Sequence, residues 1–275
     1  MNPREERRRQ AVNELVDSVA IEEFRAAHGN VELPPVAIVI AAYKEVGNIE
    51  SVMATVPATL CGLLAKAIVV IDGEEDGTAA IVRASGHFAV IAPVNRGQGA
   101  ALRLGYRVAR EFGAEYIVTA DADGQSDAAD LAVVLQPVVS NEADFVNGSR
   151  RLGRTESSDA VRNLGVVVYA TIISALAGTA VTDTANPMRA MRAELTERLV
   201  LDEPQYQASE LLLSAIFAGV RFTERPVTMR ARAGGKSKKG GNLAYGYRYG
   251  KVVGRTYLRE RRAGHQPLRT RTTSA

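Results

Sequence analysis

Two aspartates stand two positions apart, directly after a short apolar run. The run covers residues 116–120, and the aspartates are Asp121 and Asp123. Two carboxylates so close together are unfavourable unless a cation neutralises them, and oxygen ligands suit Mg²⁺ or Mn²⁺. Such a metal would bridge a substrate diphosphate and stabilise it as a leaving group, and Gln125 could add a neutral oxygen. The alternative interpretation is that Asp-x-Asp only caps the turn and helix that follow.

Polar residues also follow other apolar segments. Asp72 ends the run 67–71, where a carboxylate can bind a nucleobase or a sugar hydroxyl, or can cap the next helix. Segment 95–99, Asn-Arg-Gly-Gln-Gly, leads into a helix, so its glycines permit a phosphate to approach backbone N–H groups, or form a structural turn. Asp183 and Arg189 flank a Pro-containing loop that could face an acceptor, or could be a helix cap and a surface charge.

Apolar runs typical of buried strands alternate with helical spacing over the first half of the chain. The expected strands are 36–42, 67–71, 88–92, 116–120 and 143–148, and the expected helices are 47–64, 76–85, 97–112 and 127–139. This alternation predicts an α/β fold, a mostly parallel central sheet flanked by helices on both faces. Ligands of such sheets bind beyond the carboxyl ends of the strands, so the polar residues after the strands should converge on one edge.

The pattern changes on either side of this region. Before it, residues 11–27 have the spacing of an amphipathic helix. After it, we expect an apolar helix within 164–181, helices over 190–201 and 208–218, a strand over 221–227 and a Gly/Lys/Ser loop over 234–241. Glu210 lies on one of these helices and is expected to be solvated.

The composition is that of an ordinary globular protein. The 275 residues, 46% hydrophobic and 24% charged, suffice for one large α/β domain. Cys61 is the single cysteine, so an internal disulfide is excluded and a reducing, cytoplasmic setting is expected. The first residues lack the apolar region of a secretory signal. The uncharged stretch 164–181 contains Tyr169, Thr171 and Ser174, which favour a buried or interfacial helix over a membrane span.

Basic side chains are concentrated toward the C-terminal end. The net charge is only +3, yet from Arg230 onward basic residues exceed acidic ones by about a dozen. Such a segment can attract anionic lipid headgroups, nucleic acid or phosphorylated substrates. A solvated tail is the alternative interpretation for its last residues.

Five segments occur in the order and spacing of the family-two glycosyltransferases. They are Ala-Ala-Tyr-Lys-Glu at 41–45, Val-Val-Ile-Asp-Gly at 69–73 with Asp76 and Thr78 behind it, Asn-Arg-Gly-Gln-Gly at 95–99, Asp-Ala-Asp-Gly-Gln at 121–125, and Gly-Ser-Arg at 148–150. The chain therefore resembles this family over residues 36–232, and the resemblance implies the GT-A nucleotide-diphospho-sugar transferase fold. Among subgroups it is most similar to the polyprenol-phosphate (dolichol-phosphate) sugar synthases, which transfer one sugar to a lipid phosphate with inversion.

The resemblance implies roles for individual residues and a division of the chain. The donor nucleotide would be bound by Ala41, Tyr43, Glu45, Asp72, Arg96, Gly97, Asp121 and Ala122. The metal, Mg²⁺ or Mn²⁺, would be held by Asp121, Asp123 and Gln125, and the catalytic residues would be Asp123 and Asp183. Donor and acceptor phosphates would face Arg150, Arg162, Arg232, Ser237 and Lys238. The implied divisions are an N-terminal helical extension over 1–30, a GT-A catalytic domain over 31–232, and a basic loop and tail over 233–275.

Three departures from the family pattern concern the donor and the acceptor. Ile71 replaces the first residue of a paired Asp-Asp, and Asn-Pro-Met-Arg at 186–189 replaces the usual Cys-Gly-Phe-Arg. Ala208 stands about where relatives that glycosylate alcohols carry an Asp as general base. A hydroxyl acceptor needs such a base, whereas a phosphate monoester is already ionised. The absence favours a lipid-phosphate acceptor, and Asp183 is the remaining base candidate.

The sequence therefore predicts an inverting glycosyltransferase that moves a sugar from a UDP- or GDP-sugar to a polyprenyl phosphate. It would be peripheral at the inner, cytoplasmic face of a membrane and would bind no nucleic acid. One alternative is transfer to a hydroxyl acceptor, such as a natural product or a polysaccharide, with Asp183 as the base. A nucleotidyltransferase would need a Gly-rich, Arg-containing loop after the first strand, which residues 41–47 do not supply. A non-catalytic binder of membranes or nucleic acid is the third alternative, although aromatic residues for base stacking are confined to 245–249.

Overall fold

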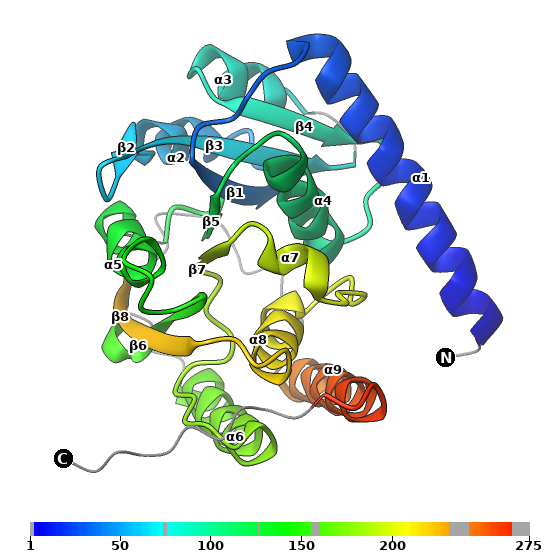
Figure 1. Cartoon of the computed structure of the whole chain (residues 1–275), viewed down its shortest axis with the longest axis vertical. Helices are drawn as coiled ribbons and strands as arrows, with labels where there is room; N and C mark the ends of the chain where they lie inside the picture. Colours follow the sequence, from blue (N-terminus) through cyan, green and yellow to red (C-terminus); the bar gives the residue numbers. More distant parts are fainter. Residues whose placement is uncertain (1–2, 74–75, 126, 156–159, 231–241, 266–275) are drawn as a thin grey trace.

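A central sheet with helices on both faces organises the chain, and the computed structural model describes residues 3–73, 76–125, 127–155, 160–230 and 242–265 (Figure 1). The strands are β1 (Val36–Ala42), β2 (Thr59–Leu60), β3 (Leu63–Asp72), β4 (Phe88–Ala92), β5 (Tyr116–Asp121), β6 (Phe145–Thr155), β7 (Arg189–Arg192) and β8 (Phe222–Met229). The helices are α1 (Pro3–His28), α2 (Ile49–Thr55), α3 (Thr78–Ala84), α4 (Gln98–Glu111), α5 (Ala128–Val139), α6 (Ala160–Ala177), α7 (Leu195–Arg198), α8 (Gln207–Phe217) and α9 (Asn242–Arg262).

The sheet joins a parallel half to a mixed half. Its strand order is β2-β3-β1-β5-β7-β6-β8, with β4 also paired to β3. Strands β4, β3, β1 and β5 are parallel, and β8 is parallel to β6. Strand β7 runs antiparallel to both β5 and β6, and β2 forms a short antiparallel hairpin with β3. The expected mostly parallel α/β sheet is confirmed.

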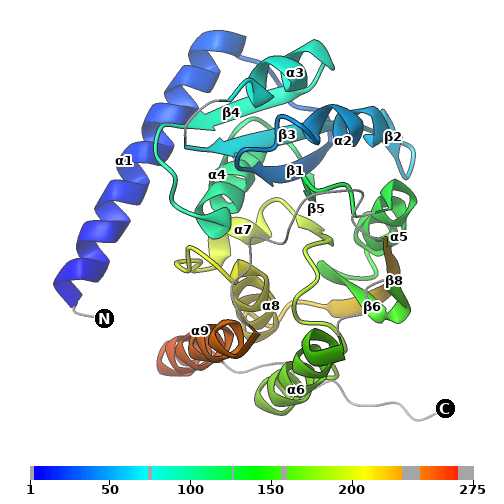
Figure 2. The same cartoon turned by 180° about the vertical axis from the view of Figure 1, so that it is seen from behind.

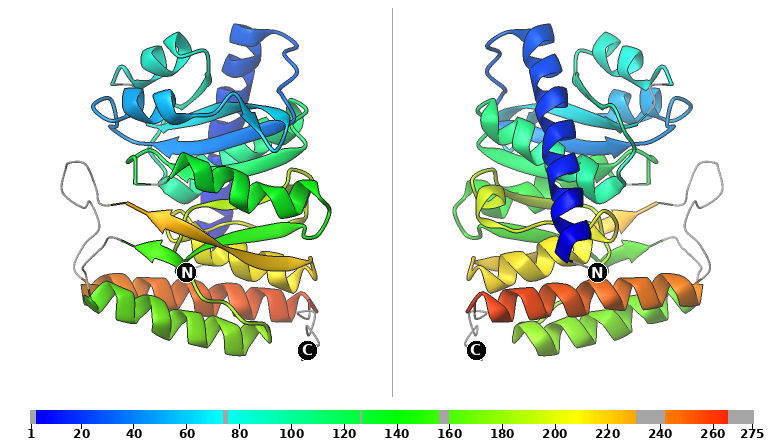
Figure 3. Two further views of the ribbon diagram at one scale, coloured as in Figure 1. Left: turned by 90° about the vertical axis from the view of Figure 1, so that its left-hand side faces the viewer. Right: turned by 90° about the vertical axis from the view of Figure 1, so that its right-hand side faces the viewer.

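Alternating side chains of the central strands supply two apolar cores, one on each face of the sheet. In β1, Ala37 and Val39 belong to the core that includes residues of α1, α4 and α8. Val36, Ile38 and Ile40 belong to the core that includes residues of α2, α3 and α5. Figures 2 and 3 show this layering, with α6 and α9 side by side beyond the β8 end of the sheet.

Helix α1 covers the region where an N-terminal amphipathic helix was expected, and it is longer than the apolar spacing indicated. Helix α1 packs on α4 and β4. Val16, Ile21 and Phe24 are buried, and the ring of Phe24 lies 4.9 Å from that of Phe112. The helix therefore packs against the sheet domain along its C-terminal half.

The prediction of a helix over 47–64 is correct for its first half and wrong for its second half. Helix α2 ends at Thr55, and the chain then forms the β2–β3 hairpin. Proline disfavours helical conformation at the residue before it, and Val56, which precedes Pro57, is extended with φ −68° and ψ 118°. The hairpin turn has positive φ at Cys61 (50°) and Gly62 (80°).

The prediction of a helix over 190–201 is also wrong. This region begins with strand β7, in the middle of the sheet. Ala190 and Met191 of β7 are fully buried, each in a different one of the two cores. Only the short helix α7 follows. Pairing with β5 and β6 on both sides decides the conformation here, which overrides local propensity.

Residues 242–262, where a basic tail was expected, form helix α9. Helix α9 packs on α8 and α6, and Tyr249, Val252 and Val253 are buried in it. Helix α6 carries most of the uncharged stretch 164–181. Among the helices that the structure describes, none combines the length and apolarity needed to cross a bilayer.

Candidate active site

The parallel register brings the polar residues after β1, β3 and β5 to one edge of the sheet, as expected. Ala41 lies opposite Asp121 across the β1–β5 pair, and Ala42 lies opposite Ile71 across the β1–β3 pair. Asp72 ends β3 beside Ala92 of β4. This edge is where an α/β sheet binds its ligands, and we refer to it as the donor edge.

The Asp-x-Asp motif leaves the donor edge at the end of β5. Asp121 Oδ1 accepts a hydrogen bond from Gln98 Nε2 at 3.2 Å, and Asp123 Oδ1 accepts one from the backbone N–H of Gln125 at 3.2 Å. Both aspartates are partly exposed, whereas Ala122 between them is buried. In the described part of the chain, no group of three or more His, Cys, Asp and Glu side chains could hold a metal ion by itself.

The donor set nevertheless fits a divalent cation that shares its ligands with a substrate. Mg²⁺ is typically bound through one or two carboxylates and completes its shell with phosphate oxygens and water. Asp121 and Asp123 offer two carboxylates on one partly exposed turn. Gln125, expected as a third ligand, forms two hydrogen bonds with Arg230, directly after β8. Its side-chain Nε2 donates to the backbone O of Arg230 at 3.2 Å, and its backbone O accepts from the backbone N–H of Arg230 at 2.9 Å.

Asp72 binds the neighbouring turn of its own chain. This carboxylate is buried and accepts hydrogen bonds from the backbone N–H groups of Arg96 (3.0 Å) and Gly97 (2.7 Å). Burial raises the pKa of Asp72, and the two N–H groups oppose that shift. The predicted contact of Asp72 with the nucleoside would therefore have to replace or share these hydrogen bonds.

The side chain of Arg96 points away from the donor edge, contrary to its expected role in nucleotide binding. Its Nη2 lies 2.7 Å from Asp17 Oδ1, and its Nη1 donates to Asn13 O at 3.0 Å, both on α1. This pair is largely buried, with 7% of the Arg96 side chain exposed. The guanidinium therefore fastens α1 to the turn, and only the backbone of Arg96 faces Asp72.

The glycines of segment 95–99 accommodate the close approach of another part of the chain. A Cβ added at Gly97 would lie 2.5 Å from Pro204 O, and one added at Gly99 would lie 2.1 Å from Glu203 O. The backbone N–H of Gly99 donates to Pro204 O at 2.8 Å. Close approach of two backbones thus explains the Gly-x-Gly spacing here.

Gly99→Ala is expected to lower the free energy of unfolding by about 1–3 kcal/mol, because the added methyl group must push segment 203–204 away. Gly254→Ala is the matched control, since a Cβ there meets nothing within 4 Å and alanine favours the helix. Urea unfolding of the two variants measures both effects. Equal stability of Gly99→Ala and the wild type would show that this close approach has no energetic weight.

Arg150 and Asp183 form a buried, bidentate ion pair. Arg150 Nε and Nη2 donate to Asp183 Oδ2 (2.6 Å) and Oδ1 (2.8 Å), and the backbone N–H groups of Arg150 and Ala185 donate to the same carboxylate. The Asp183 side chain is 0% exposed. Burial alone would raise its pKa, but the hydrogen bonds and charge of Arg150 outweigh burial and hold the pKa below its ordinary value.

This geometry disfavours the expected role of Asp183 as general base. Both carboxylate oxygens already accept hydrogen bonds, and a lowered pKa makes the group a weaker base. Asp183 is instead paired with Arg150, whose side chain is 10% exposed. The buried position of Asp183 thus gives no support to the expectation that it faces an acceptor.

A second cluster of polar side chains, partly buried, adjoins this pair. Its only sign in the sequence is the presence of polar residues within apolar strands. Arg189, expected in a loop, is buried in β7 and donates from Nε to Asn147 Oδ1 at 3.0 Å. Asn147 Nδ2 donates to Glu224 Oε1 (2.8 Å) and to Asp183 O (2.6 Å). Glu224 Oε2 also accepts from the backbone N–H of Thr182 at 2.8 Å. The cluster fixes the turn that carries Asp183 to β6 and β8.

Glu210 is buried, contrary to the expectation that it is solvated. Its carboxylate is 0% exposed and lies 2.8 Å from Arg259 Nη1 of α9. It also accepts hydrogen bonds from the backbone N–H groups of Asp202 (2.8 Å) and Glu203 (3.0 Å). Glu210 therefore holds the loop 202–204 that contacts Gly99 at the start of α4.

The structure describes only some of the remaining predicted site residues. Tyr43 is 40% exposed at the donor edge. Glu45 accepts a hydrogen bond from Asn48 Nδ2 at 2.8 Å, at the start of α2. Arg162 lies on α6, at a position where only the backbone is described. Arg232, Ser237 and Lys238 lie outside the described residues.

The sheet order and the Asp-x-Asp turn at its donor edge define a GT-A-like nucleotide-diphospho-sugar transferase fold. The model of Glycosyl transferase family 2 matches residues 37–200, and the chain belongs to this family.

Known proteins of similar sequence and structure agree with this assignment. An uncharacterized glycosyltransferase of Mycobacterium tuberculosis is 32% identical over 76% of this chain and 91% of that protein. A dolichyl-phosphate hexose transferase of Haloferax volcanii is 29% identical over 82% of this chain and 95% of that protein. Glucosyl-3-phosphoglycerate synthase of Mycobacterium tuberculosis, solved with Mn²⁺, UDP-glucose and phosphoglyceric acid, has the same fold, with a TM-score of 0.65 at 21% identity over 86% of this chain and 84% of that one. The chain is a glycosyltransferase.

Proposed function

We propose that this glycosyltransferase moves a sugar from a UDP- or GDP-sugar to a polyprenyl phosphate, with inversion and with Mg²⁺ or Mn²⁺. The observation that carries the choice of acceptor is the buried pair of Asp183 and Arg150. With Asp183 committed to Arg150 and alanine at position 208, neither base position considered from the sequence provides an available carboxylate. A phosphate acceptor needs none, because its oxygen is already ionised.

The reaction would be a single displacement at the anomeric carbon. An acceptor phosphate oxygen forms the new C–O bond as the bond to the nucleoside diphosphate breaks on the opposite face, which inverts the configuration. A divalent metal would stabilise the departing diphosphate. Asp121 and Asp123 would hold that metal, and Gln98 would orient Asp121 through its 3.2 Å hydrogen bond.

The nucleoside would lie against Ala41, Tyr43, Glu45 and Asp72 at the donor edge. Among the phosphate contacts expected from the sequence, Arg162, Arg232, Ser237 and Lys238 stay part of this proposal. The turn that holds Gln125 against Arg230 supports the view that the chain after β8 starts beside the metal site. The homologous dolichyl-phosphate hexose transferase of Haloferax volcanii supports a lipid phosphate as the acceptor.

A peripheral position on a membrane is part of the proposal and is supported by the two neighbouring helices α6 and α9 (Figure 3). Both expose apolar side chains: Val168 and Ile172 on α6 are 47% and 41% exposed, and Tyr247 and Leu258 on α9 are 74% and 51% exposed. The last turn of α9 is basic. Apolar side chains beside basic ones favour the surface of an anionic membrane.

A donor and acceptor screen tests this function. Purified protein would be given UDP-, GDP- and dTDP-sugars with Mn²⁺ or Mg²⁺, alone, with a short polyprenyl phosphate, or with phosphoglyceric acid. Release of nucleotide and formation of the glycosylated acceptor would be followed by mass spectrometry. We expect product only when both a divalent metal and the polyprenyl phosphate are present.

Each other outcome points to a different acceptor or class. Product with phosphoglyceric acid, the compound found in the structurally similar synthase, would favour a soluble phosphorylated acceptor. Metal-dependent nucleotide release that is indifferent to the lipid would favour a hydroxyl acceptor. Absence of both product and nucleotide release with every donor would contradict the proposed function.

A further inference from the structure

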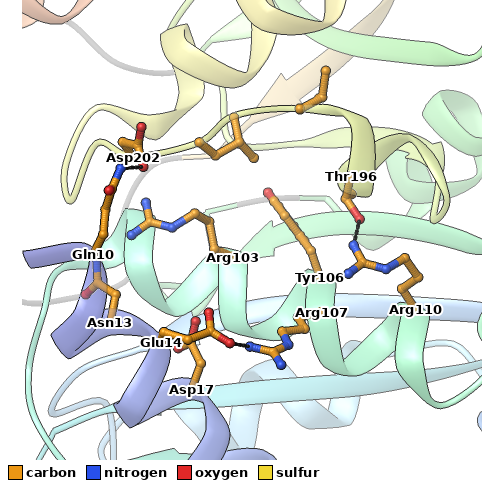
Figure 4. Close-up of a pocket in the computed structure, with 12 residues that line it drawn as sticks. Gln10, Asn13, Glu14, Asp17, Arg103, Tyr106, Arg107, Arg110, Thr196 and Asp202 are labelled. Atoms are coloured by element: carbon orange, nitrogen blue, oxygen red, sulfur yellow. Dashed lines mark hydrogen bonds and ion pairs between the residues drawn. The ribbon is translucent and has the colours of Figure 1, made fainter. Parts of the chain in front are cut away.

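A cavity of about 360 Å³ lies between α1, α4 and the segment from Thr196 to Asp202, away from the donor edge (Figure 4). Its size is at the lower end of the range for small-molecule sites. Three arginines on one face of α4 line it, namely Arg103, Arg107 and Arg110. Gln10 and Glu14 of α1 also line it and are exposed at its rim.

The acidic residues of the cavity are matched by basic partners. Glu14 lies 2.9 Å from Arg107, Asp17 lies 2.7 Å from Arg96, and Asp202 lies 3.7 Å from Arg259. Arg107 is also paired with Glu111 at 2.7 Å. The acids are therefore engaged in ion pairs with arginines other than Arg103 and Arg110.

Arg103 and Arg110 differ from their neighbour Arg107, because within the described residues neither has a carboxylate at ion-pair distance. Arg103 Nη1 donates to Glu203 O at 3.0 Å, and Arg110 Nη1 donates to Thr196 Oγ1 at 3.1 Å. Burial lowers the pKa of Arg103, and the more distant Glu210, Asp17 and Asp202 oppose that shift only in part. An anion in the cavity would supply the missing compensation.

The spacing of the two arginines sets the shape of the ligand. Residues seven apart lie on the same face of a helix, about 10 Å apart along its axis. Figure 4 shows Arg103 and Arg110 at opposite sides of the cavity, with Tyr106 between them. We propose that the cavity binds a small metabolite with an anionic group, phosphate or carboxylate, at each end.

The same site is connected to the donor edge through a short chain of contacts. Arg103 holds Glu203 O, and the adjoining Pro204 O accepts from the N–H of Gly99. Gln98, one residue earlier, donates to Asp121. A ligand on Arg103 is therefore expected to change the affinity for the donor nucleotide severalfold, an effect that rests on the proposed function.

Calorimetric titration of the full chain tests the binding site without turnover. The probe is fructose 1,6-bisphosphate, whose phosphates terminate a six-carbon chain, with EDTA present so that no metal can bridge it to Asp121 and Asp123. We expect saturable binding of one molecule per chain, and none of neutral fructose. Arg103→Gln with Arg110→Gln is expected to raise Kd about a hundredfold, roughly tenfold for each lost charged hydrogen-bond donor.

Three further variants test whether a loss of probe binding is specific to the cavity. Arg198→Gln removes the same charge from an exposed site on α7 outside the cavity lining and should leave Kd unchanged. Asp123→Ala should also leave it unchanged, because the donor edge is not involved. Gln10→Glu adds a negative charge at the exposed rim and should weaken binding severalfold even if the double arginine variant does not fold.

The proposal is overturned by any of three results. The first is the absence of saturable binding at millimolar probe. The second is a Kd that is the same in wild type, in Gln10→Glu and in a folded double arginine variant. The third is loss of probe binding in Asp123→Ala but in none of the other variants. Titration of UDP with Mn²⁺, with and without saturating probe, then tests the connection to the donor edge. An unchanged UDP affinity would remove the regulatory role and leave the binding site in place.

Discussion

Asp123→Ala is expected to abolish metal-dependent sugar transfer while the protein stays folded. A bound metal contributes several kcal/mol to stabilising the leaving group, so kcat/KM should fall by about a thousandfold or more. Asp123 is partly exposed, and it accepts a hydrogen bond from the backbone of its own turn. Initial rates across a Mn²⁺ titration, with the donor and acceptor found in the screen, measure the effect.

Glu115→Ala is the matched control for this prediction. Glu115 is exposed and directly precedes β5, so its carboxylate lies at the opposite end of the strand that carries Asp121. Its removal should change neither the rate nor the Mn²⁺ dependence. Wild-type activity in Asp123→Ala, with an unaltered requirement for Mn²⁺, would refute the assignment of Asp123 to the metal.

Asp183→Asn is expected to destabilise the fold by about 3–5 kcal/mol, because it leaves the buried guanidinium of Arg150 without its counter-charge. Urea unfolding at neutral pH measures this loss. The effect should depend on pH. Since the pKa of Asp183 is held below its ordinary value of 3.8, the folded state takes up its proton less readily than the unfolded state does.

The sign of the pH dependence follows directly. The stabilisation from Asp183 is fully present above pH values near 3.8 and is lost as the pH falls through the lower pKa of the folded state. The difference in stability between wild type and Asp183→Asn should therefore shrink in acid. A stability difference between the two proteins that stays constant as the pH falls below 3.8 would contradict an ionised Asp183 in the folded state.

An exposed pair provides the control for the buried one. Asp144 lies 2.7 Å from Arg221, whose side chain is 48% exposed, so Asp144→Asn should destabilise the fold far less than Asp183→Asn does. Replacing both partners of the buried pair, Arg150→Met with Asp183→Leu, should destabilise less than Asp183→Asn alone, because no uncompensated charge remains.

Because Asp183→Asn is expected to destabilise the fold, a loss of activity in this variant does not by itself identify the role of Asp183. Loss of transfer in Asp183→Asn would reflect a displaced Arg150 as readily as a lost base. A positioning role predicts that folded Asp183→Asn keeps the pH profile of transfer, whereas a general base predicts the loss of one limb of that profile.

Sequence patterns determined the parallel half of the fold. The expected strands 36–42 and 88–92 agree with β1 and β4 residue for residue. A strand covered by helices on both faces must be apolar at nearly every position, so its signature is local. Because parallel strands end at one edge, the convergence of Asp72 and Asp121 could also be predicted before any contact was known.

Partners distant in the chain could not be predicted in this way. The charges of Arg150 and Asp183 were recognised, but their mutual pairing and full burial were not. Glu210 was expected in solvent because an acidic side chain is normally solvated. Only the packing of α9 supplies Arg259 as its buried partner. The glycines at 97 and 99 have a family signature, yet the segment they accommodate is identified only by the packing of residues 203–204.

The sequence by itself thus determined the α/β class, the strands of the parallel half, the Asp-x-Asp turn and the resemblance to the family. The tertiary structure decided that 189–192 is a strand and not a helix, that Arg96 faces α1, and that Asp183 is buried in a pair with Arg150. The physical reason is the range of the interactions. Apolar spacing reports how a segment divides its own side chains between core and solvent, whereas strand pairing and buried ion pairs depend on atoms that the fold brings from elsewhere in the chain.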